Sequence, residues 1–208
     1  EIVDCDWSSD VCSSDLEAVF NKIISNTINP VSIHYSIDAS GSMSGSKFRN
    51  ALYSAAAIAK ACSMIQNAQC VISFRSTQHF GRICHPVMII AYDSAKNPIS
   101  HLINYMSRVA CYGSTPEGLC FEAVMNQLKL QTKNNAEGIF INISDGQPAF
   151  SDRTSNIYYD NNLGAKHTQD QVAKIRNLNY KILSYFVSDR PNKASTDYRI
   201  FEKDRKST

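Results

Sequence analysis

The stretch from Val31 to Cys62 constrains the fold more than any other part of the sequence. Residues 31–37 are rich in β-forming side chains and end at Asp38, after which the sequence turns to Gly and Ser. Apolar side chains then recur at steps of three and four from Phe48 onwards. A strand that passes through a short loop into a helix with one apolar face is typical of an α/β unit.

The rest of the chain continues this alternation of strands and helices. Two strands are expected at 70–74 and 87–92, and the short gap between them favours an antiparallel hairpin over a crossover helix. We expect the remaining elements as a helix at 99–108, a helix after Thr115 that includes Leu119 to Leu128, a buried strand at 138–144, a polar loop at 149–163, a helix around Val172, Ile175 and Leu178, a strand at 181–187 and the start of a helix at 194–203. This order predicts an α/β fold: a doubly wound, mostly parallel sheet with one antiparallel edge strand and helices on both faces.

Composition places the chain among globular proteins. Its 208 residues are 43% hydrophobic and 19% charged, which suits one domain with one sizeable core. No apolar run approaches the roughly 20 residues that span a bilayer, and the first residues lack a secretory signal pattern, so we expect a cytoplasmic location. The seven cysteines include no C-x-x-C pair, which predicts reduced, packed thiols.

Residues 1–16 differ from the rest. They show no apolar periodicity, hold the only tryptophan and look like a translated sequencing adapter. We therefore predict a non-native or disordered leader at 1–16 and a single domain at 17–208. The leader has five acidic and no basic residues, which leaves 14 acidic and 21 basic residues, a formal charge of +7, in the remainder. This excess suits an acidic partner surface, but the sequence lacks the Lys/Arg blocks typical of nucleic-acid binding.

Two of the predicted parallel strands end in an aspartate, at the edge where α/β sheets bind ligands. Asp38 follows the first strand and Asp145 follows the later central strand. In an extended chain alternate residues face the same way, so Asp38, Ser40 and Ser42 are expected to point together. Thr115, at the start of a helix, completes the candidate set. All five side chains offer oxygen, which favours Mg²⁺ (or Mn²⁺) over zinc or copper.

Each of these residues also has a simpler interpretation. A turn with a helix cap accounts for the first three, an N-cap for Thr115 and a plain turn for Asp145. One oxygen suffices for a cap, so the whole set favours a metal. A phosphate loop is rejected because Lys47 does not stand in a Gly-Lys-Ser/Thr sequence. Glu117 is a candidate to hydrogen-bond close to the metal.

Three motifs resemble the metal-ion-dependent adhesion site of von Willebrand factor A (vWA) domains. They are Asp38-x-Ser40-x-Ser42, Gly113-Ser114-Thr115 and Ser144-Asp145-Gly146. The resemblance covers roughly residues 29–203. It implies that the Ser and Thr hydroxyls coordinate Mg²⁺, with both aspartates bound directly or through water. It also implies that a Glu or Asp of a partner protein completes the coordination shell.

A narrower resemblance is to the vWA domain of the T subunit of aerobic cobaltochelatase. It is carried by Thr115-Pro116-Glu117-Gly118, Ile143-Ser144-Asp145-Gly146-Gln147-Pro148 and Leu183-Ser184-Tyr185-Phe186. It implies a role in cobalamin biosynthesis, beside an AAA+ ATPase and a large chelatase subunit. The sequence stops soon after Phe201, where this family has a last strand and helix, so we expect those two elements to be missing.

Three functions remain open on the sequence alone. The first is a non-catalytic, Mg²⁺-dependent protein-binding domain of a chelatase. The second is a vWA domain of an adhesin or a phage-encoded scaffold. The third is a metal-dependent hydrolase that uses the same carboxylates with a bound water; it needs a general base near the ion, and no histidine is placed there by the sequence.

Overall fold

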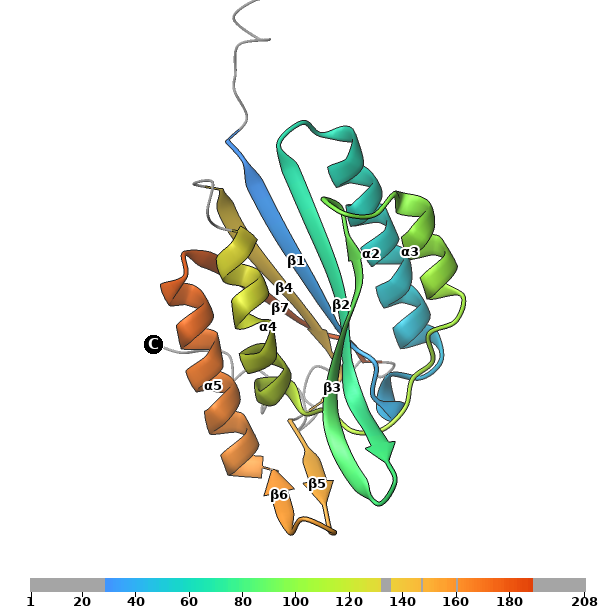
Figure 1. The fold of residues 1–208 in the computed structure, drawn as a ribbon, viewed down its shortest axis with the longest axis vertical. Coiled ribbons are helices and arrows are strands. Elements are labelled where there is room, and N and C mark those ends of the chain that lie inside the picture. Colours follow the sequence, from blue (N-terminus) through green and yellow to red (C-terminus); the bar gives the residue numbers. More distant parts are fainter. Residues whose placement is uncertain (1–28, 132–135, 147, 160, 189–208) are drawn as a thin grey trace, which may run out of the picture.

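The computed structural model describes residues 29–131, 136–146, 148–159 and 161–188 (Figure 1). The predicted leader at 1–16 lies outside the described residues, and so does the helix expected to start within 194–203. The division into a leader and one domain therefore stays a prediction.

Five strands form one sheet in the order β3-β2-β1-β4-β7. The strands are β1 (Val31–Asp38), β2 (Ala68–Phe80), β3 (Ile83–Asp93), β4 (Glu137–Ser144) and β7 (Tyr180–Phe186). All neighbours pair in parallel except β3, which pairs antiparallel with β2 at one edge. The predicted sheet, with its antiparallel edge strand and its hairpin, is confirmed.

Two pairs of helices cover the two faces of the sheet (Figure 1). They are α2 (Ser46–Met64) and α3 (Ile99–Met106) on one face, and α4 (Glu117–Gln131) and α5 (Asn161–Asn177) on the other. The buried stripe of α2 includes Ala51, Ala55 and Ala59. Because alanine is small, α2 lies close to β2. Larger side chains fill the opposite face, namely Phe121, Val124, Leu128, Phe140, Val172, Ile175 and Tyr180.

The prediction of a polar loop at 149–163 was wrong in part. It contains a small hairpin of β5 (Phe150–Asp152) and β6 (Ile157–Tyr159), followed by the first turn of α5. Phe150 and Tyr159 are buried together with Cys84 near the tip of the β2–β3 hairpin. Burial against a distant segment stabilises these two strands, which are too short to show an apolar alternation of their own.

The core contains a buried histidine and buried thiols, and the thiols confirm the prediction of reduced, packed cysteines for the described residues. His34 is buried, with its Nε2 2.9 Å from Ser73 Oγ and its ring stacked on Phe140. The described cysteines are free thiols, and Cys62, Cys70, Cys84 and Cys120 are buried. Among the described residues, no helix is both long and apolar enough to cross a membrane.

Candidate metal site

The site forms where β1 and β4 end side by side. Asp38, the last residue of β1, accepts a hydrogen bond at Oδ1 from the backbone N of Ser40, at 2.8 Å. Its Oδ2 accepts from Ser144 Oγ at 2.9 Å and from Thr115 Oγ1 at 3.2 Å. Asp38 is therefore the centre to which the other segments are joined.

A second run of contacts continues from the loop after β1 to Asp145. Ser40 Oγ lies 3.0 Å from Ser42 Oγ, and Ser42 Oγ donates to Asp145 Oδ1 at 2.7 Å. The ammonium of Lys47 pairs with the other oxygen, Asp145 Oδ2. The structure thus brings all five predicted residues into one hydrogen-bonded cluster. Asp38 has no exposed surface whereas Ser42 is exposed, so the cluster opens to solvent at Ser42.

Thr115 reaches Asp38 because its loop is bonded to the loop that follows β1. The N–H of Tyr112 donates to the carbonyl of Ala39 at 2.8 Å, and the N–H of Gly41 donates to the carbonyl of Gly113 at 3.0 Å. These two bonds fix the relative positions of segments that are about 70 residues apart in the sequence.

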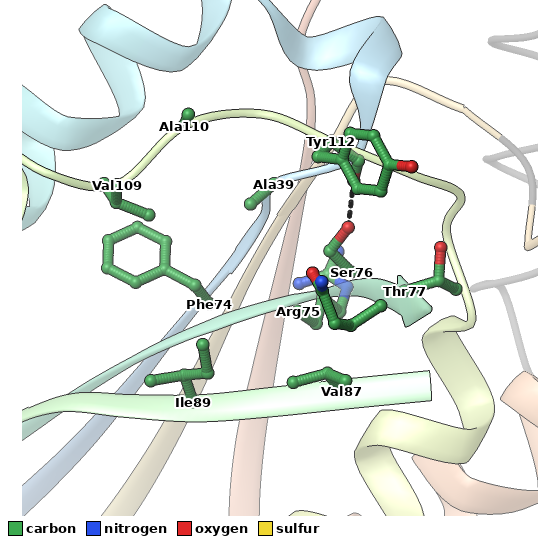
Figure 2. Close-up of a pocket in the computed structure, with 11 residues that line it drawn as sticks. Ala39, Phe74, Arg75, Ser76, Thr77, Val87, Ile89, Val109, Ala110 and Tyr112 are labelled. Atoms are coloured by element: carbon green, nitrogen blue, oxygen red, sulfur yellow. Dashed lines mark hydrogen bonds between the residues drawn. The ribbon is translucent and has the colours of Figure 1, made fainter. Parts of the chain in front are cut away.

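The same loop is also bonded to β2. Ser76 Oγ donates to the carbonyl of Tyr112, as Figure 2 shows, and the N–H of Ser114 donates to Thr77 Oγ1 at 2.9 Å. Gly113 has a φ of +73°, and a Cβ there would lie 2.2 Å from Thr77 Oγ1. Only glycine fits this position. A pocket of about 110 Å³ lies between the loop and the β2–β3 hairpin (Figure 2).

The N-cap interpretation of Thr115 is not what the structure shows. Helix α4 begins at Glu117, and the N–H of Cys120 donates to the carbonyl of Pro116 at 3.0 Å. The Thr115 hydroxyl donates to Asp38 instead. Thr115 is therefore oriented toward the cluster.

Sequence reasoning missed Arg75, a fully buried cation on β2. Its guanidinium pairs with Glu117 Oε1 at 3.0 Å and donates to Ser36 Oγ and the Ile143 carbonyl, both at 3.0 Å. Asn142 Nδ2 donates to the same Glu117 oxygen at 2.9 Å. Glu117, predicted to hydrogen-bond close to the metal, is thus held in a buried ion pair beneath the site.

The electrostatics of Asp38 favour a bound cation. Burial raises the pKa of the Asp38 carboxyl above its ordinary value, while Arg75 and the bonds from Ser40 and Ser144 oppose that shift. A buried carboxylate is costly unless a positive charge or hydrogen bonds stabilise it. A divalent ion beside Asp38 would supply that charge.

The donor set fits a hard cation. None of the five side chains of the cluster is a His or Cys, the ligands that zinc and copper sites prefer. The cluster offers two carboxylates and three hydroxyls, and Mg²⁺ commonly combines such oxygens with water. The Lys47 ammonium on Asp145 shows that this carboxylate already attracts a cation.

No protein-family model matches the sequence, and no curated protein matches it. Solved structures do match. The SpRpn10 VWA domain aligns with a TM-score of 0.56 and 10% identity, over 87% of this chain and 84% of that one. The chain has the fold of a vWA domain. The pilus adhesin SpaC from Lactobacillus rhamnosus GG, in its open conformation, aligns with a TM-score of 0.58 and 12% identity over 86% of this chain. The chain spans only 26% of SpaC, and identities this low establish the fold alone.

Proposed function

We propose that this vWA domain binds one divalent cation, Mg²⁺ or Mn²⁺, and uses it to bind a carboxylate of a partner protein. The ligands are Asp38, Ser40, Ser42, Thr115 and Asp145. The observation that carries the proposal is the meeting of oxygen-bearing side chains from three separate segments around a buried aspartate.

The chemistry of the cluster explains why a partner would be bound through the ion. Three of the five ligands are neutral hydroxyls, so they leave much of the charge of a divalent cation uncompensated. The cluster opens to solvent at Ser42. A Glu or Asp of a partner can approach from that side and complete the coordination shell, as hard cations prefer oxygen ligands.

Thermal stability in rising Mg²⁺ tests the metal. A ligand that binds only the folded state stabilises it by about 2.7 kcal/mol at 100 times its Kd. We expect the Tm of the wild type to rise with Mg²⁺ and that of Asp38→Asn not to rise. Asp170→Asn is the matched control, because Asp170 is exposed on α5, and it should respond like the wild type. An equal rise in Asp38→Asn would contradict the proposal.

The metal-free variant separates loss of a ligand from damage to the fold. Since the pKa of Asp38 is raised above 3.8 in the folded state, the metal-free wild type loses stability as pH rises from about that value through the raised pKa. Asparagine keeps the shape and carries no charge. We therefore expect metal-free Asp38→Asn, unfolded with urea at pH 7, to be at least as stable as the wild type.

A narrower form of the proposal is a subunit of the cobaltochelatase type, which works with an AAA+ ATPase in the cytoplasm. Its support is the sequence resemblance of three short segments, including Thr115-Pro116-Glu117-Gly118. Purified AAA+ subunit of an aerobic cobaltochelatase is the probe. Binding that requires Mg²⁺ and is lost in Asp38→Asn would support this role, and no binding with or without Mg²⁺ would overturn it.

A further inference from the structure

The ammonium of Lys47 is bound to Asp145, the carboxylate at the end of the cluster. Lys47 lies in the first turn of α2, and its ammonium pairs with Asp145 Oδ2 while Ser42 Oγ donates to Asp145 Oδ1. Both side chains are largely withdrawn from solvent, with 15% of Lys47 and 4% of Asp145 exposed. Both oxygens of Asp145 are therefore already engaged.

An ammonium and a divalent cation compete for the same carboxylate. Two positive charges a few ångströms apart repel each other strongly where water is scarce. A metal ion held by Asp145 and Ser42 would lie close to the present position of the Lys47 ammonium. The two cations cannot both stay bound to Asp145 without a large electrostatic cost.

We propose that the Lys47 ammonium competes with the divalent cation for Asp145. A divalent ion must displace this ammonium from Asp145 in order to bind. This inference rests on the proposed function of the site. In the metal-free domain the ammonium neutralises Asp145 and so stabilises the folded chain. The ammonium also favours divalent over monovalent cations at the site, because a monovalent ion offers Asp145 no more charge than the ammonium already does.

The structure provides room for the displaced side chain. Lys47 lines a groove of about 380 Å³ beside α2, together with Tyr35, Asn50, Ser54 and Tyr185. Lys47 therefore already borders the groove, whose lining also includes hydroxyl and amide groups. We expect the ammonium to leave Asp145 by side-chain rotation into this groove, with α2 staying in place.

The affinity for Mn²⁺ tests this role. We expect Lys47→Met, which removes the charge but keeps most of the length, to bind Mn²⁺ at least about tenfold more tightly, since a close charge–charge contact changes affinity by about that factor or more. Lys47→Arg keeps the charge and should stay within about threefold of the wild type. Lys60→Met is the matched control: Lys60 is exposed on the same helix, and its loss should leave the affinity unchanged. Calorimetry or the electron paramagnetic resonance of free Mn²⁺ gives the Kd.

The outcomes separate this inference from the proposed function. Equal or weaker Mn²⁺ binding by Lys47→Met, with binding still abolished by Asp38→Asn, would overturn the competition and leave the metal site standing. Binding by Lys47→Met but not by the wild type would support both. Absence of binding in both would overturn both. The Tm of Lys47→Met provides a check on folding: it should fall below the wild type without metal and recover in Mn²⁺.

Discussion

At the scale of single residues, the central feature is a carboxylate removed from water. Asp38 has no exposed surface, and the buried pair of Arg75 and Glu117 lies beneath it. Arg75 lowers the cost of ionising Asp38, while Glu117 keeps Arg75 in position. The site therefore depends on a charged group that touches none of the proposed ligands through a described hydrogen bond.

Removing Arg75 should damage the fold more than any surface charge does. In Arg75→Met the Glu117 carboxylate stays buried without its cation, and breaking a buried pair in this way costs about 3–5 kcal/mol. We expect a loss of that size in the free energy of unfolding, measured by urea denaturation. The double variant Arg75→Met/Glu117→Gln should recover part of it.

The exposed pair of Lys181 and Glu137 provides the comparison. Lys181 is 73% exposed in its side chain, so Lys181→Met should cost less than about 1 kcal/mol. Equal losses for Arg75→Met and Lys181→Met would show that the buried pair does not stabilise the fold.

The difference between the predicted and the missed residues has a physical cause. Asp38 and Asp145 could be predicted because each stands at the end of a strand, and the end of a parallel strand marks a binding edge. Arg75 shares one face of β2 with Ser73 and Thr77, which lie two residues before and after it. Polar side chains at every second position are typical of a solvent-exposed face. Helix α4 covers that face, and nothing local to β2 reveals it.

At the scale of elements, the loop before α4 positions Thr115. Its contacts with β2 and with the loop after β1 are made mostly by backbone groups. The motif at 113–115 could be predicted, but its partners Ser76 and Thr77 could not. Their hydroxyls bond to backbone groups of the loop, and backbone groups leave no trace in the loop's side-chain types. The β5–β6 hairpin was missed for a related reason, since contacts with a distant hairpin stabilise it.

Gly113→Ala should disturb this loop and the proposed metal site together. A non-glycine residue at positive φ costs about 1–2 kcal/mol, and the added Cβ would also meet Thr77 Oγ1. We expect a loss of about 3 kcal/mol in the free energy of unfolding and weaker Mn²⁺ binding, because Thr115 shifts. Gly81→Ala is the control: Gly81 has a φ of +64°, and an added Cβ there would meet no atom within 4 Å. It should lose only about 1 kcal/mol and keep its Mn²⁺ affinity; weaker binding in both would contradict the account.

At the scale of the whole molecule, the sheet places three segments at one edge. The alternation of strands and helices predicted a doubly wound sheet, and that prediction is confirmed. It could not show that β1 and β4 are neighbours, since strand order depends on how each crossover packs. Their parallel pairing places Asp38 beside Ser144 and Asp145, and this makes one site out of residues more than 100 positions apart.

Anomalous X-ray scattering from crystals grown with Mn²⁺ tests the central claim most directly, because it locates the ion. The account predicts one Mn²⁺ in contact with the hydroxyls of Ser40, Ser42 and Thr115, with the Lys47 ammonium no longer on Asp145. A crystal with Mn²⁺ bound elsewhere, or with none bound and the Lys47–Asp145 pair intact at millimolar Mn²⁺, would contradict it.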